Sequence, residues 1–473
     1  MSITASALFI QGCSSPQLQP WHTEKLKEEF TAADAADVQS FDDYLQLEKR
    51  LFAELDTKVY AAVDTGPAFT LARYSNGSLA DPRNDQPNFN RSFVMTAAEP
   101  LGAVLLLHGM SDSPYSLRAL AQTLSASGYT VLGLRMPGHG TAPSGLKYVQ
   151  PDDMTAAVTL GMNYLGSVMD GKPAHIIGYS TGATLALNFA LDSMGGEALP
   201  IPASLILISP AIRISATATF AGFKNALSSA PGLGGLAWLG VMPEFDPYKY
   251  NSFATNATNV VHQLTRSVDS KIAARVKSAP GNILPPTLIL KSTVDSTVTT
   301  EAVVDNLLNL LQPNRHELVL FDINRAAAIA DLMESDPGPL TRRLEADSTL
   351  PFAVSIVTNA NPASAAVVVN RKNSFSDKPV SSAALGLEWP ADVLSLSHVA
   401  LPFPPDDPLY GRQRPPDHSN VFLGDIATRG ERGLLKLPGD WVLRMRYNPF
   451  YDYLETRVLD WLSTNTVAAG AGQ

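Results

Sequence analysis

A regular succession of apolar strands and amphipathic helices begins at Gly102, and it restricts the fold more than any other feature of the sequence. The strand candidates are short, apolar on both faces and without polar alternation; they are Ala103–Leu107, Tyr129–Leu134, Ala174–Ile177, Ser204–Ile208 and Thr287–Leu290. Between the first two, residues Leu117, Leu120, Ala121 and Leu124 have the spacing of a helix buried along one face. Strands of this kind, connected by helices, are typical of a parallel sheet covered on both sides. The sequence therefore predicts an α/β fold with a mostly parallel central sheet.

The flanking regions supply further elements. Trp21–Lys58 has near-helical apolar spacing and is predicted to be helical, while Phe69–Tyr74 and Ser92–Met95 are predicted to be outer strands. The segment His316–Phe321 has the composition of one more strand. A C-terminal helix is predicted to close the fold with one apolar face, made of Phe450, Tyr453, Leu454, Val458 and Trp461.

Two stretches interrupt the regular succession and suggest the domain organisation. Residues 212–285 are predicted to form a cap, and residues 325–392 an insertion with a hairpin of Phe352–Thr358 and Ala366–Asn370. The remaining boundaries follow from these two: 1–20, a flexible or signal-derived N-terminus; 21–100, N-terminal helices and outer strands; 101–211 and 286–324, the two halves of the core; and 393–473, the completion of the core.

The pentapeptide Gly178-Tyr179-Ser180-Thr181-Gly182 matches the pattern G-x-S-x-G and lies between a predicted strand and a helix of small residues. A serine in such a turn adopts a strained backbone, which only small neighbours permit, and its hydroxyl is raised above the sheet. We therefore predict that Ser180 is a catalytic nucleophile.

A second turn, His108-Gly109-Met110, directly follows the first strand of the series. An oxyanion formed at Ser180 needs two backbone donors, one after the nucleophile and one after this strand. The predicted oxyanion hole is accordingly formed by the N–H groups of Thr181 and Met110. The side chains of His108, and of His139 in the turn Pro137–Gly140, are interpreted as structural.

Three runs carry a resemblance to a known family: HGMSDSPYSLRALAQTL, GYTVLGLRMPGHGTAPSGL and IIGYSTGATLAL. They resemble the monoacylglycerol lipase and lysophospholipase-like branch of the α/β-hydrolases, over residues 101–215 and, less closely, 284–312. The resemblance implies an α/β-hydrolase fold and a catalytic triad in the chain order serine, acid, histidine. The acid it implies is Asp295, in the run PTLILKSTVDSTV after the strand that begins at Thr287.

The histidine of the triad is less directly indicated. His316 precedes its strand and would therefore lie at the opposite edge of the sheet from Ser180. The next histidine, His398, follows the apolar run Val393–Leu396, which is predicted to be a short strand, and His418 is the alternative. We expect His398 to be the general base, with residues 325–392 inserted before it.

An activated serine with an oxyanion hole catalyses acyl transfer. The predicted cap offers apolar side chains for an acyl group, among them Phe220, Phe223 and Trp238, and Tyr179 adjoins the nucleophile. Carboxylic esters with a lipid-like or medium-chain acyl group are the favoured substrates. An amidase or aminopeptidase, with Glu244 or Asp246 receiving the substrate amine, and a non-catalytic envelope binding protein are the alternatives.

Charge and cysteine content restrict the partners. The formal net charge of −10 and the lack of a basic run argue against nucleic-acid binding. Neither a cofactor nor a metal site is indicated by the histidine spacing or the glycine patterns. Cys13 follows the apolar stretch Ile3–Ile10 and resembles the lipidated cysteine of a bacterial lipoprotein, although no Lys or Arg precedes Lys25. Two alternatives therefore stand: an envelope lipoprotein tethered to the membrane through Cys13, and a cytoplasmic protein with a flexible apolar N-terminus.

Overall fold

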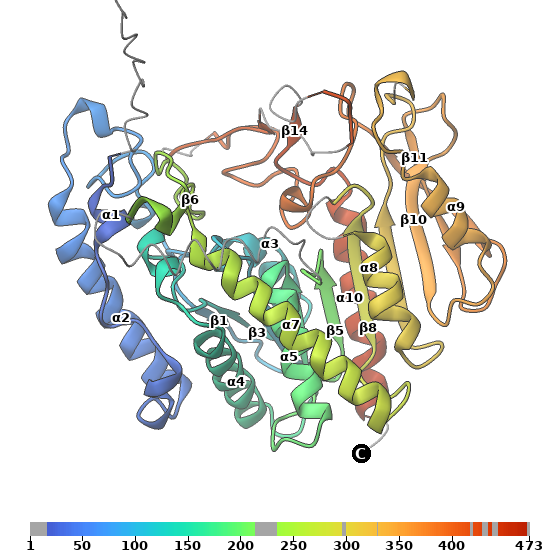
Figure 1. Cartoon of the computed structure of the whole chain (residues 1–473), viewed down its shortest axis with the longest axis horizontal. Coiled ribbons are helices and arrows are strands. Elements are labelled where there is room, and N and C mark those ends of the chain that lie inside the picture. The colour runs from blue at the N-terminus through green and yellow to red at the C-terminus, as the bar shows by residue number, and fades with distance from the viewer. Residues whose placement is uncertain are drawn as a thin grey trace, which may run out of the picture.

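The structure is a computed structural model that describes residues 17–212, 234–295, 299–328, 330–416, 420–427, 434–437 and 443–470. A ten-stranded sheet crosses the molecule in the order β1-β3-β2-β4-β5-β8-β9-β10-β11-β12 (Figure 1). The strands from β3 to β10 are parallel, and β1, β11 and β12 pair antiparallel with their neighbours. The predicted α/β-hydrolase fold with its mostly parallel sheet is confirmed.

The strands of this sheet are β1 (Phe93–Met95), β2 (Gly102–Leu107), β3 (Tyr129–Leu134), β4 (Ala174–Tyr179), β5 (Leu205–Ile208), β8 (Thr287–Ser292), β9 (His316–Phe321), β10 (Ala353–Asn359), β11 (Ala366–Lys372) and β12 (Ser381–Glu388). Two small ribbons are formed by β6 (Trp238–Gly240) with β7 (Phe253–Ala254), and by β13 (Ile426–Ala427) with β14 (Arg444–Met445). The α-helices are α1 (Pro20–Thr23), α2 (Phe41–Lys58), α3 (Arg118–Ala126), α4 (Pro151–Val168), α5 (Thr181–Met194), α7 (Thr255–Ser278), α8 (Thr300–Asn306), α9 (Gly338–Ala346) and α10 (Tyr451–Gly470).

Helices cover both faces of the sheet, as the apolar strands require. In β2, Leu105 and Leu107 belong to the core layer shared with α4, α5 and α7, whereas Val104 and Leu106 belong to the layer shared with α3 and α10 (Figure 1). Successive side chains of a strand point to opposite faces, so a strand buried on both faces has to be apolar throughout. Because β2, β4, β5 and β8 pair in parallel, their carboxyl ends lie along one edge of the sheet.

The N-terminal region differs from the prediction in two places. The helical character predicted for Trp21–Lys58 is present in three pieces, α1, a 3₁₀ helix at Ala32–Ala36 and α2, separated by irregular backbone. Ser40 begins α2 by accepting a hydrogen bond from the N–H of Asp43. The strand predicted for Phe69–Tyr74 is wrong. These residues form a 3₁₀ helix and turns, because the buried guanidinium of Arg73 donates hydrogen bonds to other loops rather than lying beside a strand partner.

The second interruption extends the main sheet. The predicted hairpin is present as β10 and β11, and β10 also pairs in parallel with β9, where Val354 lies opposite Leu318. The strand predicted for Val393–Leu396 is wrong, since this segment has irregular backbone. Its carbonyls accept hydrogen bonds from the backbone and side-chain amides of a single residue, Asn324, and not from a neighbouring strand.

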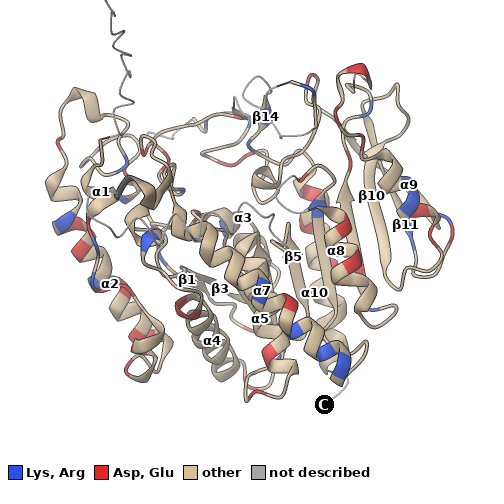
Figure 2. Ribbon diagram, in the orientation of Figure 1, with Lys and Arg blue, Asp and Glu red and all other residues tan. Residues whose placement is uncertain are grey.

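Charged side chains of both signs are mixed on the surface, for instance along α2 (Figure 2). A search of the described helices for one apolar and long enough to cross a bilayer finds none.

Candidate active site

Ser180 lies in a sharp turn between β4 and α5. Its backbone is in the left-handed region, with φ 54° and ψ −116°, and its N–H donates a hydrogen bond to the carbonyl of Ile208 at 2.9 Å. The two glycines of the pentapeptide are required by close approaches. A Cβ at Gly178 would lie 2.5 Å from the Cα of Ala183, and one at Gly182 would lie 2.1 Å from the carbonyl oxygen of Leu107. The sequence pattern therefore follows from the steric demands of this turn.

The turn after β2 lies directly beside this serine. A Cβ built on Gly109 would be 3.3 Å from the Cβ of Ser180 and 3.1 Å from the ring of Tyr179, so glycine lets the two turns come this close without crowding. Within the described residues, no hydrogen bond takes up the backbone N–H of Met110 or of Thr181. Two free N–H groups beside a serine hydroxyl are what an oxyanion hole requires.

His108 holds this turn in place and does not act as a base. Its Nε2 accepts a hydrogen bond from the N–H of Met136 at 3.1 Å, so its Nδ1 carries the proton and donates to the carbonyl of Gly109 at 2.9 Å. Burial lowers the pKa of His108 to about 4. His139 bonds the carbonyl of Pro137 in the same way, and its pKa is lowered by burial to about 3. Both rings are neutral structural groups.

Asp295 and His398 meet beyond the carboxyl end of β8. Asp295 lies three residues past that strand, and His398 begins a short 3₁₀ helix, His398–Ala400. Asp295 Oδ1 is 3.7 Å from His398 Nδ1, and the side chains are 1% and 21% exposed. This distance is longer than a hydrogen bond, and His398 Nδ1 is buried without a hydrogen-bond partner in the described structure. Catalytic hydrogen bonds are often this long before substrate binds.

Charged groups link the serine side of the site to the histidine side. Asp112, whose carboxylate lies next to Gly109, forms an ion pair of 3.0 Å with Lys249. Burial lowers the pKa of His398; Asp295 opposes this shift, whereas Lys249, Lys291 and Arg444 reinforce it. Lys249 therefore lies near enough to influence the histidine while bound to the loop that adjoins Ser180.

A cavity of about 250 Å³ lies near His398, because Val399, Lys249 and Arg444 form part of its wall and the last two act electrostatically on His398. Neither His398 nor Ser180 is itself among the residues that line it. Its wall also includes one acid, Asp246, and otherwise is mostly aromatic and basic. The aromatic and basic residues are Phe245, Lys249, Tyr250, Phe403, Tyr410, Arg444 and Arg446. Most of these side chains come from segments after His398 or from the loop between β6 and β7. The sequence analysis missed them because isolated aromatic and basic residues in irregular segments have no distinguishing spacing.

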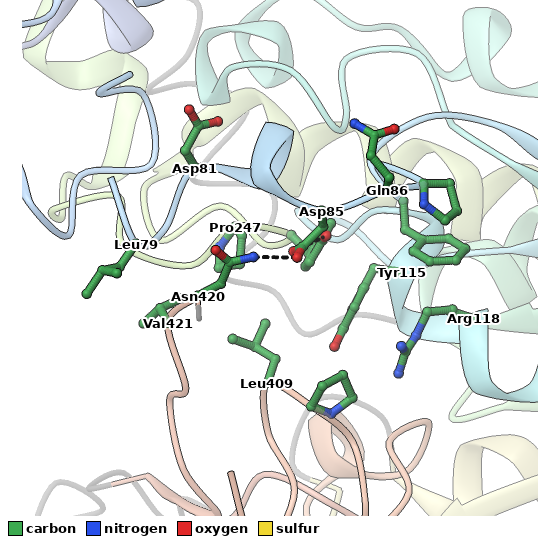
Figure 3. A pocket seen from close by; sticks show the side chains of 14 residues that line it. Leu79, Asp81, Asp85, Gln86, Tyr115, Arg118, Pro247, Leu409, Asn420 and Val421 are labelled. Carbon is green, nitrogen blue, oxygen red and sulfur yellow. Dashed lines mark hydrogen bonds between the residues drawn. The ribbon is translucent and has the colours of Figure 1, made fainter. Parts of the chain in front are cut away.

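A second cavity, of about 180 Å³, is lined by Tyr115 and Arg118 among other residues (Figure 3). Tyr115 and Tyr248 stack at 4.0 Å along its side, and Tyr115 also contacts the rings of Phe403 and Tyr410. Asp85 accepts hydrogen bonds from Asn420, drawn as a dashed line in Figure 3, and from the hydroxyl of Tyr248. The polar groups that bridge this cavity are therefore engaged in joining the N-terminal region to the C-terminal loops.

Two of the residues predicted for substrate binding, Tyr179 and Trp238, lie away from the cavity near His398. Tyr179 is 1% exposed and packs in the core, and Trp238, 4% exposed, packs edge-on against His22. Neither lines the cavity near His398. Phe220, Phe223, His418 and Cys13 lie outside the described residues.

The two acids considered for amine recognition have structural partners. The carboxylate of Glu244 accepts hydrogen bonds from the N–H groups of Asn251 and Ser252. That of Asp246 accepts one from the hydroxyl of Tyr410 and two from backbone N–H groups. Both acids hold the loop between β6 and β7 in shape.

One polar residue of the site was not singled out from the sequence. Lys291 lies in β8, is fully buried, and places its ammonium 3.0 Å from Asp295 Oδ2. A lysine inside an otherwise apolar strand was the available signal. Within the described residues, no three His, Cys, Asp or Glu side chains are grouped closely enough to hold a metal ion.

The fold and the turn around Ser180 define the class of protein: an α/β-hydrolase. Residues 104–322 match the model of the alpha/beta hydrolase family.

Individual relatives are similar over parts of their length. The thermostable monoacylglycerol lipase of Bacillus sp. (strain H-257) is 33% identical over 131 residues, which are 26% of this chain and 49% of the lipase. The carboxylesterase of Bacillus subtilis (strain 168) is 26% identical over 201 residues, 42% of this chain and 74% of the esterase. Among solved structures, a metagenome-derived lipolytic enzyme from a study of LipS and LipT has 22% identity and a TM-score of 0.40, covering 49% of this chain and 87% of its own. The chain thus spans about half the length of the lipase that it matches.

Proposed function

We propose that this protein is a serine hydrolase that cleaves carboxylic esters through an acyl-enzyme on Ser180. The observation that carries the proposal is the strained turn at Ser180 with Gly109 packed against it, at the sheet edge where β8 leads to Asp295. The names of the two curated relatives, a monoacylglycerol lipase and a carboxylesterase, support ester hydrolysis.

The proposed reaction has two halves. The hydroxyl of Ser180 attacks the ester carbonyl while His398 accepts its proton, and the N–H groups of Met110 and Thr181 stabilise the oxyanion. His398 then protonates the departing alcohol, and water attacks the acyl-enzyme by the same route in reverse. Asp295 stabilises the imidazolium that forms in each half. A lowered His398 pKa favours this role, because the imidazole is neutral and ready to accept a proton under mildly acidic conditions.

We propose a lipid-like or medium-chain acyl group as the substrate's apolar part. The support is the aromatic wall of the cavity near His398, which includes Phe245 and Phe403. An aminopeptidase is less well supported than an esterase, since Glu244 and Asp246 are already occupied by the loop that they hold.

The test combines labelling with two substrate series. We expect a fluorophosphonate probe to label Ser180 and to leave the Ser180→Ala variant unlabelled. We expect p-nitrophenyl esters to be hydrolysed far faster than amino-acid p-nitroanilides. Absence of an adduct on Ser180 in the folded protein would favour the non-catalytic alternative, and preferential cleavage of anilides would favour the peptidase.

We propose separately that Cys13 is lipidated and tethers the protein to a bacterial membrane. The support is its position after the apolar stretch Ile3–Ile10. Metabolic labelling with an alkyne fatty acid tests this: incorporation lost in Cys13→Ser supports the tether, and no incorporation into the native chain refutes it.

A further inference from the structure

Lys291 is an unusual residue for its position. It lies in the central strand β8, where every residue is buried, and its side chain is 0% exposed. An ammonium in such surroundings is costly unless an anion compensates it. Asp295 supplies that anion, with 3.0 Å between Lys291 Nζ and Asp295 Oδ2.

The two oxygens of the Asp295 carboxylate face different partners, Lys291 and His398. Oδ2 faces Lys291, and Oδ1 faces Nδ1 of His398 at 3.7 Å. A carboxylate with one oxygen held by a cation on a rigid strand can rotate little, so its other oxygen is directed at the imidazole. The positive charge of Lys291 also offsets part of the attraction by which the Asp295 carboxylate would otherwise stabilise a protonated His398.

We propose that Lys291 is a positioning residue of the catalytic triad, which fixes the orientation of Asp295 toward His398 and weakens the attraction of that carboxylate for a protonated imidazole. The inference rests on the proposed function, since it assigns Lys291 a role in the same triad. Burial is the largest cause of the lowered pKa of His398, and Lys249 and Lys291 lower it further. We therefore expect hydrolysis to continue into mildly acidic solution, with Lys291 contributing to this tolerance.

Other charged groups also face His398. Asp295 and Lys291 approach from β8 and the turn after it, Lys249 from the loop between β6 and β7, and Arg444 from β14. Lys249 forms its ion pair with Asp112, whereas Lys291 forms its ion pair with the triad acid itself. Lys291 is therefore the cation whose removal would change both the orientation of the acid and the basicity of the histidine.

The experiment measures the pKa of His398 directly. The full-length protein, carrying ring-¹³C-labelled histidine, is titrated by NMR, and the His398 signal is assigned from its absence in His398→Asn. The same titration is made on Lys291→Met and Lys291→Arg, and kcat and KM for a p-nitrophenyl ester are followed against pH. Lys172→Met is the matched control, because Lys172 is exposed and donates a hydrogen bond to the carbonyl of Pro100 before β2.

We expect Lys291→Met to raise the pKa of His398 by about 0.5 to 1 unit, because a nearby cation has been removed. The acid limb of kcat/KM should move to higher pH by a similar amount, with kcat reduced roughly 10- to 100-fold and KM little changed. Lys291→Arg should keep the limb within about 0.3 unit of the wild type, since the charge is retained. Lys172→Met should change none of these quantities.

Three results would overturn the inference: an unchanged His398 pKa in folded Lys291→Met, an unchanged kcat in that variant, or a wild-type His398 pKa at or above 6.5. The pKa of His398 in the wild-type protein can be measured without any variant. The inference can therefore still be refuted if Lys291→Met fails to fold. The NMR titration does not depend on turnover. If the His398 pKa shifts in Lys291→Met but the probe does not label Ser180, the proposed function is refuted and the effect of Lys291 on His398 is supported. If the probe labels Ser180 but the His398 pKa does not shift, the proposed function is supported and the role of Lys291 is refuted.

Discussion

The guanidinium of Arg135 lies 2.9 Å from the carboxylate of Glu48, and both side chains are almost completely buried. Arg135 follows β3, and Glu48 lies in α2, 87 positions earlier in the chain. Arg135 also bonds Glu29 and the carbonyls of Met136 and His139. The N-terminal region, which the family match does not include, is thus joined to the turn that packs against His108.

This ion pair should make a large contribution to stability that depends on both partners. Glu48→Ala leaves Arg135 buried with one fewer compensating charge, and we expect the free energy of unfolding to fall by about 3 to 5 kcal/mol. Urea unfolding followed by circular dichroism measures this. The control is Glu28→Ala, which removes the exposed pair with Arg50 and should cost about 0.5 kcal/mol or less. Equal effects of the two substitutions would contradict the prediction.

The close approach of Gly182 to β2 predicts a selective loss of activity. Gly182→Ala would place a Cβ 2.1 Å from the carbonyl oxygen of Leu107, so the strand or the nucleophile turn has to shift. We expect ester hydrolysis to fall roughly 100-fold or more, because displacements near 1 Å have effects of that size. The control is Gly166→Ala in helix α4, where the new Cβ would lie 3.9 Å from the nearest atom, the Cβ of Pro200. Activity should be kept, and the free energy of unfolding should rise by about 0.5 to 1 kcal/mol because alanine favours the helix. Full activity in Gly182→Ala would show that the turn tolerates the shift.

Buried histidines predict a stability that decreases in acid. Burial lowers the pKa of His175 from 6.5 to about 4, and its ring bonds Ser204 and Thr466. The unfolded chain binds a proton at this residue below pH 6.5 while the folded chain does not, so stability is full above pH 6.5 and is lost as the pH falls toward 4. His175→Gln should therefore reduce the proton uptake on unfolding by about one within this window. Urea unfolding between pH 4 and 8 gives the slopes, and identical slopes in the two proteins would argue against the assignment.

Local patterns predicted the parts of the fold that local forces determine. The strands β2 to β5 and the turn at Ser180 were predictable, because two-sided burial demands apolar runs and the strained turn demands glycine. The strand predicted for Phe69–Tyr74 was wrong because Arg73 donates hydrogen bonds to distant residues, Asn90 and Gly140, which the local sequence does not indicate. The position of Lys291 was readable in the sequence, but its partner was not, since an ion pair is a property of the folded geometry. The aromatic wall from Phe403 and Tyr410 depends entirely on how irregular segments return to the sheet.

The assignment of the general base gives the sharpest comparison between two variants. His398 Nδ1 lies 3.7 Å from Asp295 Oδ1, whereas His418 lies outside the described residues. When a triad histidine is removed, only the oxyanion hole and substrate binding still accelerate the reaction, and they supply a small part of the rate. We therefore expect His398→Ala to lower kcat for a p-nitrophenyl ester about 10⁴-fold or more with KM little changed, as for Ser180→Ala. His418→Ala should keep most of the activity. Single-turnover kinetics on the three variants, checked for folding by circular dichroism, measure this. Substantial turnover in His398→Ala together with its loss in His418→Ala would transfer the role of base to the second histidine, because the acyl-transfer chemistry needs one imidazole and no more.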